Sequence, residues 1–323
     1  MPKLLTEADV RAALAMPALI DAMEGALAAF SAGRVTQPVR TVLEVGADKN
    51  YFGVMPASID DEQAVGAKLV TVYHGNHARG LASHQATIVL LDHATGELVA
   101  LLDGRYITEA RTAAVSAVSV RHLANPDASV LAILGSGVQA KSHLEAIRHE
   151  RKPTEVRVWS PTPAHREEFA REQSAATGLP VRACASASEA ARGASIIVLA
   201  TASKTPVIDT ADVIDGAHIC AVGACRPDQR EMGSALFARA RVFVDSRSAA
   251  FKEAGEILIP IADGSATDAH VLGELGDVIS RRLAGRTGPK DVTVFKSLGL
   301  AVEDVIAAKL AVQASPNAGT FTL

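Results

Sequence analysis

The spacing of apolar and polar residues follows two different patterns along this chain, and one pattern replaces the other near Pro126. In the first part, a helical period runs from Thr6 to Phe30, and Thr6 with Asp9 forms an expected capping box. An Ala-rich helix is expected over 108–123. Between the two helices, four short β-like runs separated by Gly- and Asn-containing turns are expected at 39–45, 64–72, 86–91 and 98–103. This pattern predicts a mostly antiparallel sheet accompanied by helices.

After Pro126 the chain alternates between short apolar runs and helical patterns. The expected strands are 130–134, 155–159, 180–183, 195–200, 218–223 and 241–244, and the expected helices between them are 139–150, 163–176 and 186–192. Such alternation predicts a doubly wound parallel sheet covered by helices. A last helix is expected over 302–314. The fold prediction is therefore α/β: a Rossmann-type domain, 125–299, inserted into an α+β domain made of 1–124 and 300–323.

A glycine-rich turn joins the first parallel strand to the helix that follows it. The turn reads Gly135-Ser-Gly-Val-Gln-Ala140, which is a G-x-G-x-x-A pattern. Gly135 allows a tight turn, Gly137 allows close backbone approach to a pyrophosphate, and Ala140 allows the helix to pack on the strand. The helix N-terminus offers free N–H groups to the phosphates. With a strand before it and a helix after it, the turn predicts dinucleotide binding.

Composition narrows the class of protein further. The 323 residues are 48% hydrophobic and 21% charged, with a net charge of −4 and no basic block, so we expect a globular protein that binds neither nucleic acid nor a membrane. The first residues contain no signal-peptide core, and we expect a cytoplasmic location. Three cysteines are too few for a disulfide framework. His74, His77, His143 and His165 form no pair at ligand spacing, so no metal is expected.

Five segments, in order, resemble the ornithine cyclodeaminase/mu-crystallin family over essentially the whole chain. They are Gly66–Thr71, Leu102–Ala114, Gly135–Ala140, Val222–Asp228 and Phe295–Asp304. The resemblance implies an NAD(P)-dependent enzyme, and its closest motifs are those of the mu-crystallin-like ketimine reductases. It also implies a homodimer joined through the non-Rossmann domain, which would bind the substrate.

The resemblance places a substrate-carboxylate clamp on Arg40, Lys68 and Arg111. A guanidinium can hold a carboxylate with two hydrogen bonds, and an ammonium adds a point charge that could also contact the reacting nitrogen. Without the resemblance, Lys68 reads as a solvated strand residue, Arg111 as a helix-surface arginine and Arg40 as an edge-strand charge. His84, at the mouth of an expected strand, is either a proton donor to the imine or a hydrogen-bonded loop histidine. Lys68 and His84 are thus the catalytic candidates.

The expected cofactor contacts begin at the glycine-rich turn and continue through the loops after later strands. They are Gly135, Ser136, Gly137, Val138, Gln139, Ser160, Thr162, Thr201, Ala202, Val222 and Ser297. The strand ending at Trp159 is followed by no acidic residue for a ribose 2′-OH, and Pro161 stands where NADPH-using relatives tend to have Arg. Arg157 and Arg166 are nearby candidates for a phosphate. The sequence therefore predicts NAD or NADP without choosing between them.

One position separates the possible chemistries. Cyclodeaminases carry a carboxylate where this chain has Cys225, and the missing acid disfavours loss of ammonia. The leading hypothesis is an NAD(P)H-dependent reductase of a small α-imino acid, either a cyclic ketimine or an acyclic imine such as iminosuccinate or the pyruvate imine. An amino-acid dehydrogenase is the same reaction reversed. A cyclodeaminase and a non-catalytic, crystallin-like cofactor-binding protein are the alternatives.

Overall fold

The chain divides into two compact units. The computed structural model describes residues 1–322, apart from the side chains of residues 74 and 77. Unit 1 comprises 1–111 and 299–323, and unit 2 comprises 112–298. The first boundary lies inside helix α3 (Gly104–Leu123) rather than at residue 124, because Val120 packs in the same core as Leu131 and Leu144 of unit 2. The second boundary lies one residue before the expected position.

Unit 1 is built on a mixed, mostly antiparallel sheet. Its order is β16-β1-β7-β6-β5-β4-β2, with β3 paired to the same edge of β4, and only β1 and β7 run parallel. The strands are β1 (Lys3–Leu5), β2 (Val35–Thr36), β3 (Thr41–Val45), β4 (Asn50–Ile59), β5 (Ala64–Val72), β6 (His84–Leu91), β7 (Leu98–Asp103) and β16 (Gly319–Thr320).

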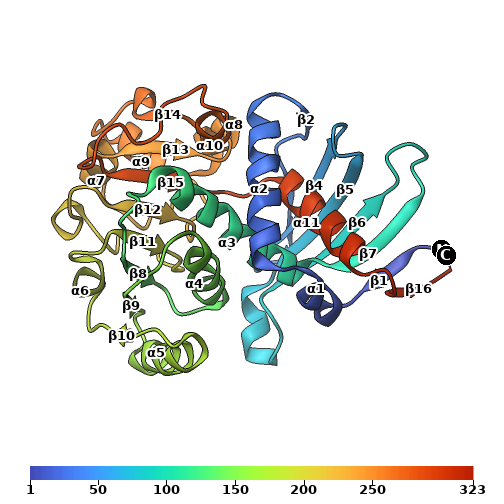
Figure 1. Ribbon diagram of the computed structural model, residues 1–323, viewed down its shortest axis with the longest axis horizontal. Coiled ribbons are helices and arrows are strands. Elements are labelled where there is room, and N and C mark those ends of the chain that lie inside the picture. The colour runs from blue at the N-terminus through green and yellow to red at the C-terminus, as the bar shows by residue number, and fades with distance from the viewer. Residues whose placement is uncertain (323) are drawn as a thin grey trace. The chain divides into compact units, whose positions relative to one another are not determined.

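Helices cover one face of this sheet. Helix α11 (Ala301–Ala314) packs on β4, β5 and β6, and helix α2 (Met16–Ser31) packs against α11 (Figure 1). The short helix α1 (Glu7–Ala13) lies beside β7, and the 3₁₀ turn η1 (His74–Arg79) connects β5 to β6. Helix α11 is buried along almost its whole first two turns. The charged residues of its first turn, Glu303 and Asp304, are therefore shielded from solvent.

Unit 1 differs from the expected pattern chiefly in two places, and the short strands β1, β2 and β16 were not expected either. The single helix expected over 6–30 is broken, because Pro17 has no N–H and its ring disfavours a helix that continues from residue 13. The capping box of Thr6 and Asp9 is present at the start of α1. Strand β4 was not expected, because it contains Gly53 and Pro56, which are unfavourable inside a strand. Pro56 is tolerated because β3 pairs with 50–54 and β2 with 58–59, so Pro56 lies between the two ladders.

Unit 2 is a fully parallel, eight-stranded sheet in the order β10-β9-β8-β11-β12-β15-β13-β14. The strands are β8 (Val130–Leu134), β9 (Glu155–Trp159), β10 (Val181–Ala183), β11 (Ile196–Leu199), β12 (His218–Ala221), β13 (Arg241–Val244), β14 (Val271–Glu274) and β15 (Thr293–Lys296). The chain moves outward from β8 to β10 and returns to β11 on the other side of β8. This reversal is the switch point at which ligands bind in doubly wound sheets.

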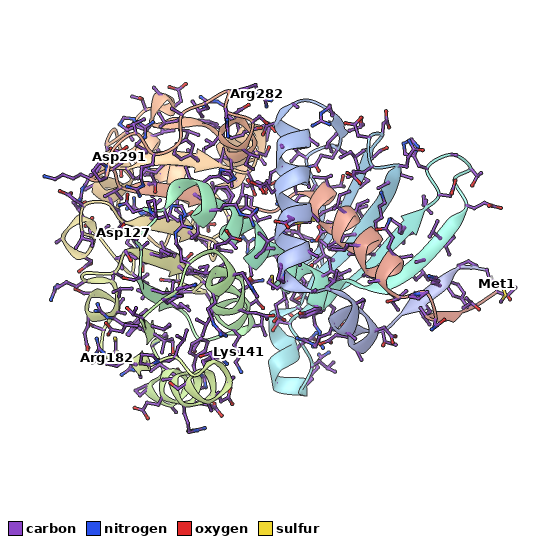
Figure 2. All side chains as sticks on the ribbon, in the orientation of Figure 1. Met1, Asp127, Lys141, Arg182, Arg282 and Asp291 are labelled. Carbon is purple, nitrogen blue, oxygen red and sulfur yellow. The ribbon has the colours of Figure 1, made fainter. Side chains whose placement is uncertain are left out.

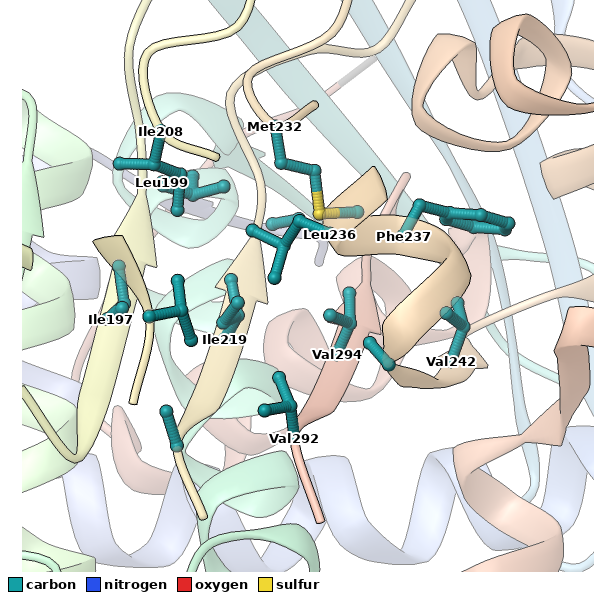
Figure 3. Packing of buried hydrophobic residues seen from close by; sticks show 14 of the residues in the cluster. Ile197, Leu199, Ile208, Ile219, Met232, Leu236, Phe237, Val242, Val292 and Val294 are labelled. Carbon is teal, nitrogen blue, oxygen red and sulfur yellow. The ribbon is translucent and has the colours of Figure 1, made fainter. Parts of the chain in front are cut away.

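Helices cover both faces of the parallel sheet. They are α4 (Val138–Glu150), α5 (Pro163–Thr177), α6 (Ala187–Ala191), α7 (Ser234–Arg239), α8 (Arg247–Glu253), α9 (Gly255–Ala262) and α10 (Leu275–Ile279), with 3₁₀ turns η2 (Thr210–Asp212) and η3 (Asp268–His270). Leu131 and Ile133 pack with the end of α3, α4 and α5, whereas Ala132 and Leu134 pack with α6 to α9. Figure 3 shows Leu236 and Phe237 of α7 over Ile219 and Val294. This arrangement confirms the expected doubly wound fold.

Apart from β13, the sequence missed the short elements between residues 223 and 296. Helices α7 to α10 have only five to eight residues, and strands β14 and β15 have four. Such short elements do not establish a visible period of apolar residues.

Charged side chains such as Lys141 and Arg182 are exposed on the surface of this unit (Figure 2). Within residues 1–322, no single helix is long and apolar enough to cross a membrane; α1 and α2 meet the length and composition test only together, across an 87° bend.

Candidate active site

The glycine-rich turn has the geometry of a phosphate-binding loop. Gly135 follows β8 with φ +122°, and a Cβ at this position would lie 2.3 Å from the Ala200 carbonyl oxygen. The Gly135 N–H donates to the Trp159 carbonyl over 2.7 Å. Only glycine fits these constraints. Gly137 is the N-cap of α4 and has no atom within 4 Å of its Cβ direction, and it supplies no side-chain cap to the first N–H groups of the helix.

The loop after β9 lies next to this turn. The Ser136 hydroxyl donates to the Ser160 hydroxyl over 3.0 Å, and Arg166 donates to the Ser160 carbonyl over 2.9 Å. Thr162 is the N-cap of α5 and makes no side-chain capping bond. Arg157 instead donates two hydrogen bonds to the Glu155 carboxylate and one to the Arg192 carbonyl. Arg166 is therefore the better placed of the two arginines for a coenzyme 2′-phosphate.

The other expected cofactor residues also follow parallel strands. Thr201 and Ala202 come after β11, Val222 after β12 and Ser297 after β15. Carboxyl ends of parallel strands share one edge of a sheet, so these residues lie along the edge that carries Gly135. The Ser297 hydroxyl is buried and donates to Asp245 over 3.3 Å, which fixes this loop.

The clamp candidates of unit 1 belong to one buried cluster of charges. Lys68 lies on the helix-covered face of β5, and its Nζ is 2.7 Å from Oδ2 of Asp304. Arg111 of α3 donates from Nε to Oδ1 of Asp304 over 3.1 Å and from Nη1 to Glu303 over 2.7 Å. Asp304 and Glu303 are fully buried in the first turn of α11. The structure thus brings Lys68 and Arg111 together through two carboxylates to which the sequence assigned no role.

Arg40 joins this cluster through the backbone of residue 299. Its Nη2 donates to the Gly299 carbonyl over 3.2 Å. Gly299 has φ +87°, and a Cβ there would lie 2.5 Å from Nη1 of Arg111. A glycine is required because a side chain would displace the guanidinium. Three cations, Arg40, Lys68 and Arg111, therefore lie in one cluster with the carboxylates of Asp304 and Glu303.

The pKa values in the cluster follow from burial and charge. Burial lowers the pKa of Lys68 to about 8, with Arg111 and Arg40 adding to this and Asp304 opposing it. Burial would raise the pKa of Asp304, but Arg111 and Lys68 hold it below its ordinary value. A carboxylate bound close to these three cations would raise the pKa of Lys68. The cations of the cluster thus favour the binding of an anion.

His84 lies at the start of β6, opposite Val72 of β5 and on the same face as Lys68. Burial, together with Lys68 and Arg111, lowers the pKa of His84 to about 4. The imidazole is therefore neutral at pH 7 when the cluster holds no anion. His84 could donate an N–H hydrogen bond in this state, but it is not a stored imidazolium.

Cys225 is exposed in the loop after β12, and its thiol donates to the Val222 carbonyl over 3.5 Å. Within residues 1–322, apart from the side chains of residues 74 and 77, no three His, Cys, Asp or Glu residues form a group that could hold a metal ion. His143 has a local role, since its ring bonds to the Gln139 carbonyl and the Ser116 hydroxyl. His74 and His77 lie outside the described side chains.

A parallel sheet with a glycine turn at its switch point defines the class of Rossmann-type dinucleotide-binding proteins. Comparison with known proteins then identifies the family. Residues 1–316 match the model of the ornithine cyclodeaminase/mu-crystallin family, and the chain belongs to this family.

The similarity to known proteins extends over nearly the whole chain. The ketimine reductase mu-crystallin of Rattus norvegicus is 45% identical over 295 residues, which are 90% of each chain. The solved structure of Thermococcus litoralis Δ1-pyrroline-2-carboxylate reductase with NADH and L-proline is 33% identical, with a TM-score of 0.96, and the match covers 99% of this chain and 100% of that chain. An archaeal alanine dehydrogenase dimer with bound NAD is 29% identical, with a TM-score of 0.93, covering 99% and 98%.

Proposed function

We propose that this protein is an NAD(P)H-dependent reductase that converts a small α-imino acid into the amino acid. The observation that carries the proposal is that one chain contains both a coenzyme-type turn at Gly135 and a largely buried cluster with the three cations Arg40, Lys68 and Arg111. The turn fits a dinucleotide coenzyme, and the cluster fits a substrate with a carboxylate next to a C=N bond. The relatives that reduce pyrroline-2-carboxylate and ketimines support this interpretation.

The residues of the turn fit a dinucleotide. Gly137 leaves open space where a pyrophosphate would approach, and the free N–H groups of α4 supply donors of the right charge. Gly135 to Gln139 would hold the pyrophosphate, and Ser160, Thr162 and Arg166 would hold the adenosine ribose. Thr201, Ala202, Val222 and Ser297 would line the other half of the coenzyme. When bound, the reduced nicotinamide supplies a hydride to the imine carbon.

The chain's own residues bind, orient and polarise the substrate. Arg40, Lys68 and Arg111 would hold the carboxylate, which fixes the adjacent imine carbon in one position. Binding of the anion raises the pKa of Lys68, so that its ammonium stays charged and can donate to the imine nitrogen. His84 would be the second group within reach of the substrate, acting as a neutral N–H donor or, once the anion is bound, as a proton donor. Lys68 is the stronger candidate for the acid.

A direct assay tests the proposal. The protein should oxidise NADH or NADPH when given a preformed cyclic ketimine such as pyrroline- or piperideine-2-carboxylate, or a keto acid with ammonia. Each coenzyme is tested with each substrate, and the amino-acid product is identified by mass. If the protein binds coenzyme but reduces no imine of this panel, it is a binding protein of the crystallin kind. An alanine dehydrogenase reaction would appear as selective activity with pyruvate and ammonia.

Cyclodeamination is the alternative within the family. Cys225 has a thiol rather than a carboxylate at the position that the resemblance links to ammonia loss, and no other acid was assigned to this role. We therefore expect no proline when the protein is incubated with ornithine and catalytic NAD. Robust proline formation would favour the cyclodeaminase over the reductase.

A second copy of the chain would cover the outer face of the unit 1 sheet. Directly paired residues share a face, and the face opposite α2 and α11 carries Leu43, Phe52, Val54, Leu69 and Val89. Leu43 is 55% exposed and Leu69 is 37% exposed. An apolar face of this kind marks an interaction surface, and the dimeric alanine dehydrogenase relative supports a homodimer. Light scattering tests this, with Leu43→Lys expected to shift the protein toward monomer.

A further inference from the structure

Three ionisable side chains without an assigned role lie fully buried in unit 2. They are Glu231, in the segment after β12, Glu256 of α9 and Lys296 of β15, and each has 0% exposed area. Buried charges are costly unless they are paired and hydrogen-bonded. Their arrangement must therefore serve the fold or the site above it.

Glu231 ties together the loops that follow two neighbouring strands. Its Oε1 accepts from the Thr201 N–H and from the Thr201 hydroxyl, each over 2.7 Å, in the loop after β11. Its Oε2 accepts from the N–H groups of Gly223 and Ala224, over 2.7 and 3.2 Å, in the loop after β12. One carboxylate thus receives four hydrogen bonds from two loops. Four donors match the acceptor capacity of an ionised carboxylate.

Glu256 and Lys296 link the backbone of Glu231 to Ala224. The Glu231 backbone N–H donates to Oε1 of Glu256 over 3.1 Å, and Oε2 of Glu256 lies 3.4 Å from Nζ of Lys296. Lys296 in turn donates to the Ala224 carbonyl. The contacts form a closed ring that begins and ends at Ala224, so both the N–H and the C=O of this residue are fixed. Cys225 is the next residue along the chain.

The core anchors the other side of Glu231. Met232, the next residue, is 1% exposed and packs with Leu236 and Phe237 (Figure 3). Residues 225 to 228 are exposed by contrast. Glu231 therefore lies at the junction between an exposed loop and the core. Its hydrogen bonds hold Thr201, Gly223 and Ala224 in place relative to the core.

We propose that Glu231, held by Glu256 and Lys296, is a positioning residue for the nicotinamide half of the coenzyme. This inference rests on the proposed function. In a doubly wound fold, the β8–β10 half receives the adenosine end, and the half that contains β11 and β12 receives the other mononucleotide. Glu231 fixes the two loops of that second half before the coenzyme arrives, so binding does not have to order them. The adenosine end depends on Gly135–Gln139 and Ser160, whereas the hydrogen bonds of the Glu231 carboxylate go to Thr201, Gly223 and Ala224.

The test compares two probes that differ only in the nicotinamide ring. Affinities for NADH (or NADPH, whichever the wild type prefers) and for ADP-ribose (or its 2′-phosphate) are measured by calorimetry for the wild type and for Glu231→Gln. The glutamine amide presents N–H groups to two N–H donors, so one loop loses its acceptor. We expect NAD(P)H affinity to fall about tenfold or more while ADP-ribose affinity changes less than about twofold. Glu150→Gln, which breaks the Arg121 ion pair elsewhere in unit 2, is the matched control and should leave both affinities unchanged.

A second variant covers the case in which Glu231→Gln does not fold. The double change Lys296→Met with Glu256→Gln removes a buried charge pair without leaving either charge alone, and the amide oxygen introduced by Glu256→Gln can still accept from the Glu231 N–H. It should show the same selective loss, smaller in size. Suppose that the wild type binds NAD(P)H, but the variants lose affinity for both probes equally or for neither probe. This result would overturn the inference and leave the proposed function intact. A wild type that binds neither coenzyme would overturn the proposed function as well.

Discussion

The ammonium of Lys68 and the carboxylate of Asp304 lie 2.7 Å apart with exposed fractions of only 2% and 0%. The two residues come from the middle of β5 and the first turn of α11, which are more than two hundred positions apart in the chain. Asp304 keeps Lys68 charged against the cost of burial, and Lys68 with Arg111 keeps Asp304 ionised. The proposed clamp would therefore depend on carboxylates that hold its cations in place.

The pH dependence of activity should report Lys68. Its pKa is about 8 in the protein without substrate, so the charged form declines as the pH rises through that value. We expect kcat/KM for the imino acid to fall above about pH 8, because kcat/KM reflects the free enzyme. Lys68→Arg should move this decline to higher pH, since a guanidinium stays protonated. A profile of Lys68→Arg identical to that of the wild type would assign the decline to another group.

Removal of Arg40 should weaken substrate binding selectively. Loss of a charge-assisted hydrogen bond to a carboxylate costs roughly 1.5–3 kcal/mol, so Arg40→Ala should lose about ten- to a hundredfold in kcat/KM. Coenzyme affinity should not change. Arg34→Ala, at an exposed arginine paired with Asp61, is the control and should behave like the wild type. Steady-state kinetics with near-normal activity in Arg40→Ala would remove Arg40 from the clamp.

The two glycines of the turn should respond differently to substitution. Gly137→Val places a side chain in open space, so the thermal stability should hold while NAD(P)H affinity falls sharply. Gly135→Ala forces a Cβ against the Ala200 carbonyl at φ +122° and should destabilise the protein by more than about 1 kcal/mol. Calorimetric binding and thermal unfolding separate the two effects. Wild-type coenzyme affinity in Gly137→Val would refute the phosphate-loop assignment.

Two buried histidines should make unit 2 sensitive to acid. Burial lowers the pKa of His143 to about 4 and that of His218 to about 3, whereas an unfolded histidine titrates near 6.5. The unfolded state therefore binds more protons below about pH 6.5, and the free energy of unfolding should fall as the pH drops, by about 1.4 kcal/mol per pH unit for each histidine. His143→Gln should reduce this slope, as measured by denaturant unfolding between about pH 5 and about pH 7. His165→Gln, at an exposed site, is the control.

Local patterns could be predicted from the sequence because each depends on neighbouring residues. The turn at Gly135 and the alternation of strands and helices up to β13 are of this kind, and the structure confirms them as elements. The clamp residues required the family resemblance, since Lys68 by itself reads as a solvated strand residue. The structure shows that it is buried and paired.

Long-range charge networks could not be predicted in this way. In the sequence, Glu231, Glu256 and Lys296 resemble surface residues of short segments, although all three are buried. Lys296 is the last residue of strand β15, and a charged residue is not expected in a buried strand. The neutral state of His84 likewise depends on Lys68 and Arg111, which reach it only in the folded chain. Burial and partners decide such properties, and a single sequence contains neither.

The chain leaves unit 1 after Arg111 and re-enters it at Gly299, and these two residues approach each other closely enough that a side chain on one would collide with the other. Unit 2 is thus a cassette whose two ends border the same charged cluster of its host. Its excision and the direct joining of residues 111 and 299 by a short linker would leave the host strands uninterrupted. The same junction would accept the corresponding cassette of a relative, so that coenzyme preference and imino-acid preference could be exchanged independently.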